Sequence, residues 1–213
     1  MRVLIHASVA LLITLTASIS QGLEKPKYQV VFESGKIEYR IYDSYLVAET
    51  TVPFASSYRK ASNEGFFRLF DYISGDNVSG ASIAMTSPVQ QSAEKISMTA
   101  PVQQQKNDQG WTVAFMVPSK YDLLSVPTPT SEKIRIREVP ERIMAVIRYS
   151  GRWTEKNFDK YANKLKLDIE ERGIEPVSEP ESAVYNPPFV PPFMRRNEAM
   201  IEVSRYPSSN SSQ

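Results

Sequence analysis

Apolar and polar residues alternate along the first part of the chain as they do in half-buried strands. Every second residue is apolar in Tyr28–Phe32 and in Ile37–Ile41, and the polar segment between them reads as a turn. This pattern predicts a hairpin. Further apolar runs, some bounded by prolines, predict strands at residues 46–52, 111–117, 134–139, 143–149, 183–186 and 198–203.

Two other segments have apolar residues at helical spacing. The first is capped by Ser56 or Ser57 and runs to about Ser74, before Gly75. The second is capped by Thr154, and Gly173 terminates it. The apolar positions of these helices are Tyr58, Ala61, Phe66, Leu69, Phe70 and Ile73 in the first, and Phe158, Tyr161, Ala162, Leu165 and Ile169 in the second.

Gly65 interrupts the first helix. An interior glycine costs a helix about 1 kcal/mol relative to alanine. It therefore indicates either close packing against a neighbour or space left for another group.

The order of the predicted elements, strands followed by a helix and more strands in each half, is typical of an α+β domain. It predicts a pseudo-twofold arrangement with a curved, mostly antiparallel sheet and two packed helices. No segment reads as a linker. We therefore expect one domain over residues 24–204, followed by a disordered tail at 205–213.

A nine-residue segment occurs twice. Ile83–Gln91 reads IAMTSPVQQ, and Ile96–Gln104 reads ISMTAPVQQ. Proline cannot donate to a sheet ladder, so Pro88 and Pro101 are expected at strand edges, starts or bulges. The repeat predicts two similar extended segments near each other.

Residues 1–22 have the features of a secretory signal peptide. Met1-Arg2 gives a positive start, an apolar run follows from Val3 to Thr16, and small residues come next. An uncleaved anchor is the alternative, but the run is short for a spanning helix. We expect an exported protein, periplasmic or secreted, with no stable membrane insertion after cleavage.

Composition excludes several function classes. Without Arg2, 24 basic residues balance 24 acidic ones, so there is no broad basic surface for nucleic acid. The chain has no cysteine, and its one histidine, His6, lies in the predicted signal. Catalytic Cys/His and Ser/His pairs and ordinary zinc or copper sites are therefore not expected. We expect a monomer with no metal site of its own.

Several motifs in order resemble the SOUL heme-binding protein family. They are Tyr72–Asn77, the two Met-Thr-small-Pro-Val units, and Tyr185–Phe189 followed by Arg195–Glu198. The resemblance spans residues 27–204. It implies a distorted antiparallel β-barrel flanked by two helices, related to the effector-binding domains of bacterial transcription activators. It also implies binding of heme or another porphyrin by a carrier or buffer, not by an enzyme.

The resemblance also implies where the ligand binds, namely on the first helix and in the loop before the last strand. Aromatic and aliphatic walls suit a flat apolar macrocycle. At each of these positions, packing in the core is the alternative role. The residues concerned are Phe66, Leu69, Phe70 and Ile73 on the helix, and Phe189, Val190 and Phe193 in the loop.

Iron ligation has no histidine available in the mature chain. Tyr58, Tyr72 and Met194 are candidate axial ligands. Met85 and Met98 are candidate soft ligands, although a buried methionine more often fills the core. The sequence therefore favours tetrapyrrole binding by burial in an apolar groove.

Two other functions stay open. The related fold accommodates varied hydrophobic cations, so the ligand of this chain can be another amphiphilic small molecule. It also includes hydrolases that use buried Glu and Tyr residues, for which Glu38, Glu64 and Tyr39 are candidates.

Two further short motifs fit known functional patterns. In Arg195–Glu198, either the arginines bind an anion or an Arg–Glu pair anchors the loop. Asn77-Val78-Ser79 fits a glycosylation acceptor.

Overall fold

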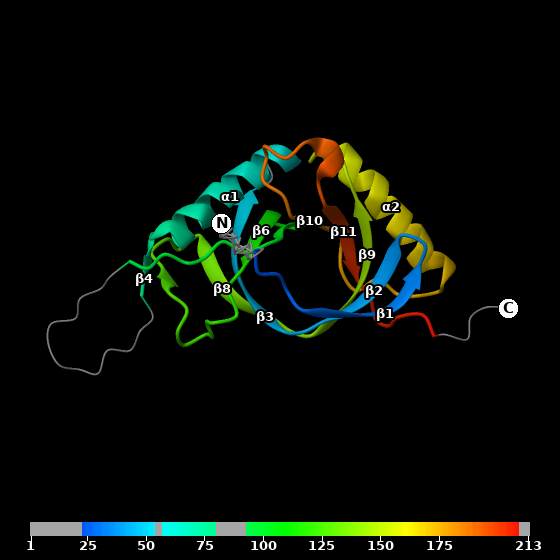
Figure 1. Ribbon diagram of the computed structural model, residues 1–213, viewed down its shortest axis with the longest axis horizontal. Coiled ribbons are helices and arrows are strands. Elements are labelled where there is room, and N and C mark those ends of the chain that lie inside the picture. Colours follow the sequence, from blue (N-terminus) through cyan, green and yellow to red (C-terminus); the bar gives the residue numbers. More distant parts are fainter. Residues whose placement is uncertain (1–22, 54–56, 80–92, 209–213) are drawn as a thin grey trace, which may run out of the picture.

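The computed structural model describes residues 23–53, 57–79 and 93–208. Nine antiparallel strands form one curved sheet, and two helices pack against it (Figure 1). The strands are β1 (Tyr28–Ser34), β2 (Ile37–Tyr42), β3 (Tyr45–Pro53), β5 (Val102–Asn107), β6 (Gly110–Met116), β8 (Ile134–Val139), β9 (Arg142–Tyr149), β10 (Glu181–Val184) and β11 (Asn197–Glu202), and the helices are α1 (Tyr58–Ser74) and α2 (Glu155–Glu171). The predicted α+β class is confirmed.

The strand order makes the pseudo-twofold arrangement visible. It runs β1-β2-β9-β11-β10-β5-β6-β3-β8. Apart from the edge strand β1, each half has four strands, with β10 and β5 paired at the centre. Helix α1 packs on β3 and β6, and α2 packs on the equivalent strands β9 and β11. The outer strands are exchanged, since β2 pairs with β9 and β8 pairs with β3.

Local sequence signals set the helix ends. The Ser57 side chain accepts a hydrogen bond from Lys60 N at the start of α1, and Gly75 follows its end with φ = 131°. Thr154 caps α2 through Asn157 N at 3.2 Å. These caps satisfy backbone N–H groups that lack a partner in the first helical turn. Both predicted N-caps are confirmed.

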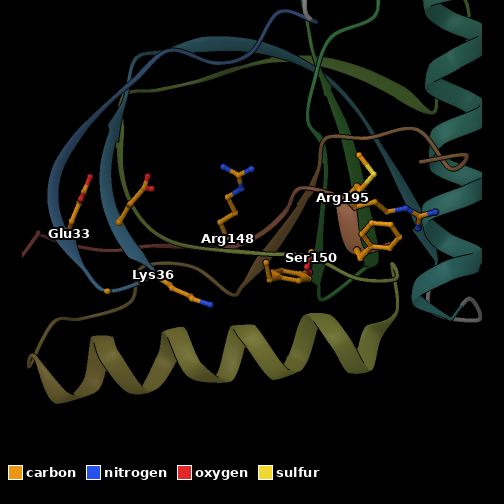
Figure 2. A pocket seen from close by; sticks show the side chains of 10 residues that line it. Glu33, Lys36, Arg148, Ser150 and Arg195 are labelled. Carbon is orange, nitrogen blue, oxygen red and sulfur yellow. The ribbon is translucent and has the colours of Figure 1, made fainter. Parts of the chain in front are cut away.

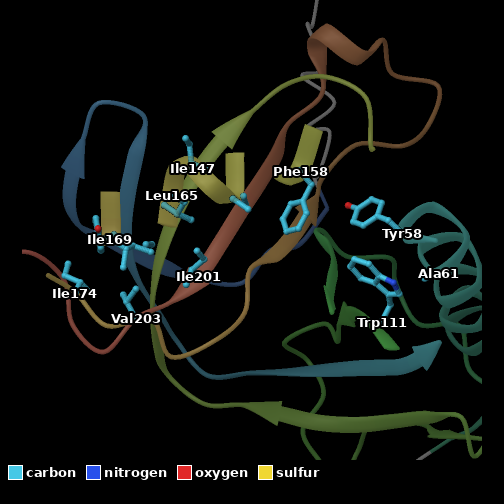
Figure 3. Close-up of a cluster of buried hydrophobic side chains, with 14 of the residues drawn as sticks. Tyr58, Ala61, Trp111, Ile147, Phe158, Leu165, Ile169, Ile174, Ile201 and Val203 are labelled. Carbon is cyan, nitrogen blue, oxygen red and sulfur yellow. The ribbon is translucent and has the colours of Figure 1, made fainter. Parts of the chain in front are cut away.

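The largest core lies between the helices and the sheet and joins the two halves (Figure 3). Tyr58 of α1 is central to it. Its ring meets Trp111 edge-on at 5.4 Å and stacks near Phe158 of α2 at 6.0 Å. A second cluster, which includes Leu69, Tyr72 and Phe115, lies between α1 and its strands. The helices are therefore held by apolar burial on one face of the sheet.

The second Met-Thr-Pro unit is placed as its proline predicts. Pro101 immediately precedes Val102, the first residue of β5. The first unit, the predicted signal peptide and the end of the tail lie outside the described residues. A second, two-stranded sheet is formed by β7 (Thr128–Pro129), which pairs with β4 (Asn77–Val78).

Gly65 packs against the sheet, which decides between the two roles considered for it. A Cβ atom at this position would lie 2.5 Å from Cγ2 of Val113 on β6. We expect Gly65→Ala to lower the free energy of unfolding by roughly 1–3 kcal/mol, because α1 must move away from the sheet. Alanine at the exposed Asn63 is the matched control and is expected to be neutral or stabilising, since it raises helix propensity. Urea denaturation measures both, and equal stabilities of the two variants would contradict this packing.

Candidate functional site

An apolar cavity of about 390 Å³ opens on the helix side of the sheet, and we call it the inter-helix cavity. Its floor is the central strand pair, where Val102 and Gln104 of β5 face Val184 and Ser182 of β10. One wall is α1, and Trp153, just before α2, also lines the cavity. The remaining lining residues are Leu23, Tyr58, Ser62, Asn63, Phe66, Phe67, Phe70, Met98, Thr99, Ala100, Tyr185, Asn186, Pro187 and Pro188.

The α1 wall is built from three phenylalanines. Phe66 and Phe70 lie one helical turn apart and their rings stack at 5.9 Å, with an interplanar angle of 12°. Phe66 also meets Phe115 of β6 edge-on at 5.3 Å, which fixes its ring against the sheet. Phe67 and Phe70 are 62% and 45% exposed. The wall therefore presents aromatic surface that this chain leaves partly uncovered.

Polar groups in the floor are already paired. Gln104 Nε2 donates to the carbonyl oxygen of Tyr58 at 3.1 Å, and the hydroxyls of Tyr58 and Ser182 lie 2.9 Å apart. Burial raises the pKa of Tyr58 above its ordinary value. These polar groups are therefore already hydrogen-bonded within the protein, and the Tyr58 hydroxyl stays neutral.

The lip of the cavity is the start of the loop between β10 and β11. Asn186 Oδ1 accepts from Arg196 N at 2.6 Å, and the Arg195 guanidinium donates to the carbonyl oxygen of Pro188 at 2.6 Å. Arg195 also stacks over Trp153, with 4.3 Å from its Cζ to the ring centroid. These contacts hold Pro187 and Pro188 at the rim.

A buried ionic network supports the lip from the opposite face of the sheet. Glu198, with 0% exposure, accepts from Tyr185 Oη at 2.7 Å and from the guanidiniums of Arg40 and Arg196. Burial alone would raise the pKa of Glu198, but Arg40 and Arg196 hold that pKa below its ordinary value. Burial and the neighbouring Glu198 raise the pKa of Tyr185. The predicted Arg–Glu pair is present as Arg196–Glu198.

The structure places the seven residues predicted to contact the ligand in different surroundings. Phe66 and Phe70 line the inter-helix cavity. Leu69 and Ile73 turn to the core, with 0% and 8% exposure. The loop residues do not line this cavity: Phe189 and Phe193 are 85% and 78% exposed, Val190 is half-buried, and Phe193 lines a different cavity. Ligand contact by these seven residues remains a prediction.

Several lining residues were not predicted from the sequence. Phe67, Trp153 and Val184 lack any periodic signal that marks them for a cavity. Val102 lies in the repeated unit, so the repeat was the available signal for the floor. Its partner across the sheet, Val184, is far away in sequence and becomes its neighbour only through strand pairing.

The candidate iron ligands also lie at different places in the fold. Tyr58 lines the cavity with its hydroxyl engaged, whereas Tyr72 is buried and donates to Pro127 O at 2.7 Å. Met194 is 65% exposed and lies at the other cavity. Met98 lines the inter-helix cavity, and Met85 lies outside the described residues. No group of three or more His, Cys, Asp or Glu side chains among the described residues is arranged to hold a metal.

The candidate hydrolase residues do not meet. Tyr39 Oη donates to Asp168 at 2.8 Å, Glu38 pairs with Arg40 at 2.7 Å, and Glu64 pairs with Arg68 within α1. Each side chain is used locally. They form no common acid/base pair.

Asn77 serves the fold. Its amide nitrogen donates to the carbonyl oxygens of Tyr72 at 2.7 Å and Glu94 at 2.8 Å, and its Oδ1 accepts from Glu94 N at 3.0 Å. The residue is only 4% exposed. A glycan at this amide is incompatible with these contacts.

Two more cavities open elsewhere on the described part of the chain. One, of about 470 Å³, lies between the β1–β2 turn, the end of β9 and the short helix η1 (Pro192–Met194) (Figure 2). The other, of about 440 Å³, lies beside Tyr121–Leu124. Neither includes the α1 aromatics. In the described ranges, no helix has the length and apolar character needed to cross a bilayer.

Comparison with known proteins gives a consistent result. Residues 23–202 match the SOUL heme-binding protein family. Heme-binding protein 1 from Xenopus laevis is 26% identical over 185 residues, covering 85% of this chain and 93% of that protein. Its Xenopus tropicalis counterpart is 25% identical with the same coverage. Among solved structures, the C-terminal domain of EcmrR is similar in fold, with a TM-score of 0.52, 9% identity and coverage of 84% and 99% of the two chains.

Proposed function

Because the chain belongs to the SOUL heme-binding protein family, we propose that it binds heme or a related tetrapyrrole in the inter-helix cavity. The observation that carries the assignment is the stacked Phe66–Phe70 pair, which lines the same cavity as Val102 of β5 and Val184 of β10. A slot between an aromatic wall and aliphatic residues suits the faces of a flat macrocycle. The cavity volume of about 390 Å³ is within the usual range for small-molecule sites.

The rim supplies a cation for a ligand carboxylate. The Lys25 ammonium lies 5.8 Å from the ring centroid of Tyr185, a lining residue, and makes no ion pair with any residue that the structure describes. Lys25 is therefore our candidate partner for a propionate of the bound porphyrin. Lys25 thus fits the charged edge, and the cavity fits the apolar faces.

The residues fit heme held mainly by burial. Among the cavity-lining side chains of the types that commonly ligate iron, Tyr58 and Tyr185 have engaged hydroxyls and raised pKa values, and Met98 has a thioether. Heme iron supplies redox and ligand-binding chemistry when it is bound, but retention here rests on the apolar contacts. We infer a binding protein, not an enzyme, and assign it a carrier or buffer role outside the cytoplasm on the strength of the predicted signal at residues 1–22.

A titration of the full-length protein with hemin and with iron-free porphyrin tests this proposal. We expect saturable binding of both, with a Kd of about 1 µM or weaker and little preference for iron. Phe70→Ser is expected to weaken both about tenfold, because it removes one of the three aromatic rings of the α1 wall. Ser62→Trp, which fills the cavity from α1, is expected to do the same.

Leu124→Ser is the matched control, since Leu124 is 89% exposed and lies at another cavity. Failure of the unaltered protein to bind either compound would overturn the function. A six-coordinate spectrum with strong preference for hemin would overturn burial as the binding mode. Tighter binding of a hydrophobic cation than of either porphyrin would favour the other amphiphilic-ligand function.

A further inference from the structure

The loop between β10 and β11, residues 186–196, exposes large apolar side chains, and we call it the apex loop. It crosses between the two helices as the orange segment at the top of Figure 1. Phe189, Phe193 and Met194 are 85%, 78% and 65% exposed. Grouped apolar exposure of this kind marks interaction surfaces, whereas single exposed residues are ordinary.

The loop is held in a shape that keeps these side chains outside. It has four prolines, at positions 187, 188, 191 and 192, which restrict its backbone. Arg195 Nε donates to Val190 O at 2.7 Å, and Gly151 N donates to Pro192 O at 2.9 Å. These hydrogen bonds thus satisfy backbone groups of the loop, but they do not bury its apolar side chains. The exposure is a fixed property of this conformation.

Cations lie beside the exposed side chains. Phe193 and Met194 line the same cavity of about 470 Å³ as Lys36 and Arg148, both of which are labelled in Figure 2. Neither cation makes a hydrogen bond or ion pair with any side chain that the structure describes. The same holds for the side chain of Arg152, which is exposed and follows the Gly151 contact to the loop.

Two carboxylates also line this cavity. Glu38 is paired with Arg40 at 2.7 Å, so its charge is compensated. Glu33 has no ion pair within the described residues and opposes the cations. In the lining, Lys36 and Arg148 therefore outnumber the one carboxylate without an ion pair, Glu33, and Arg152 beside the loop adds a further positive charge.

We propose that the apex loop docks this protein on an anionic lipid bilayer. The side chains of Phe189, Phe193 and Met194 enter the boundary between headgroups and acyl chains, and Lys36, Arg148 and Arg152 face lipid phosphates. Apolar insertion combined with basic residues at headgroup level is the usual physical basis of peripheral binding. A bilayer is favoured over a protein partner because exposed apolar side chains of a proline-rich loop lie next to cations that have no carboxylate partner.

Docking in this way has a consequence for the inter-helix cavity. Pro187 and Pro188 belong to the same loop and line that cavity. A docked loop therefore brings the cavity mouth close to the bilayer, where apolar ligands dissolve. The inference itself does not depend on the identity of the ligand.

Co-sedimentation with vesicles tests the proposal. The full-length protein is mixed with vesicles of phosphatidylcholine alone or of phosphatidylcholine with phosphatidylglycerol. We expect binding to the anionic vesicles that weakens as salt rises. Phe189→Ser/Phe193→Ser is expected to weaken it about tenfold or more. Lys36→Gln/Arg148→Gln is expected to remove most of the preference for anionic over neutral vesicles.

The matched control is Leu123→Ser/Leu124→Ser, which removes two apolar side chains that are 57% and 89% exposed at a different place. It should bind as the unaltered protein does. Thermal unfolding checks that all variants fold. Absence of binding to anionic vesicles, or equal binding by the Phe189→Ser/Phe193→Ser variant, would overturn the proposal. Self-association that this variant abolishes, without any vesicle binding, would overturn it in favour of a protein interface.

Discussion

Glu198→Ala is expected to lower the free energy of unfolding by about 3–5 kcal/mol, the cost typical of removing one partner from a buried ion pair. The carboxylate is fully buried between Arg40 and Arg196 and also accepts from Tyr185. Its loss leaves the guanidinium of Arg40, itself 2% exposed, buried without its main partner. Chemical denaturation followed by circular dichroism measures the change.

The same residue gives the protein a defined acid sensitivity. The pKa of Glu198 is lowered in the folded state, so its contribution is fully present above the unfolded pKa of about 4.3. That contribution is lost as pH falls through the lower folded pKa. Stability measured from pH 7 downward should therefore fall less steeply in Glu198→Ala than in the unaltered protein.

Glu38→Gln is the control for Glu198→Ala, because Glu38 also pairs with Arg40 but its side chain is 34% exposed. We expect a loss of at most about 1 kcal/mol there, as for other solvent-accessible pairs. Similar losses in Glu198→Ala and Glu38→Gln would show that the network is not effectively buried.

Leu69→Ala is the second large effect, with an expected loss of about 2–5 kcal/mol in the free energy of unfolding. Leu69 has 0% exposure and packs between α1 and the sheet, so truncation leaves a void in the core. Hemin affinity of the variant that remains folded should equal that of the unaltered protein. Denaturation and hemin titration of one preparation measure both quantities.

The contrast with Phe70→Ser makes this result informative. Phe70 is 45% exposed on the cavity side of the same helix, so its replacement should change affinity more than stability. A fall in hemin affinity for Leu69→Ala, without loss of stability, would place the ligand on the core side of α1. That outcome would restore the ligand contact predicted for Leu69 from the sequence.

The two residues show why the site was only partly predictable. Helical spacing identifies an apolar stripe that contains Phe66, Leu69, Phe70 and Ile73, but it does not say which edge of the stripe meets the sheet. The answer depends on where β3, β5, β6 and α2 lie around the helix. In the structure Leu69 and Ile73 take the sheet side, and Phe66 and Phe70 face the cavity.

The loop before β11 shows a different limit. Its prolines and apolar residues are plain in the sequence and indicate an irregular connection. The direction of Phe189 and Phe193 is set instead by contacts that the loop makes with Arg195 and with Gly151, which lies between β9 and α2. No local pattern reports such contacts, so the sequence could not distinguish a cavity wall from an exposed tip.

The sequence by itself determined most strands of the sheet, the helix caps, the α+β class and the family, because these depend on neighbouring residues and on motif order. Only the tertiary structure decided the inter-helix cavity and its supporting network. The cavity floor requires β5 to pair with β10, and the network joins Arg40 to Glu198 across 158 positions of the chain. Contacts of this range arise from packing and strand pairing, which the local pattern of residues does not encode.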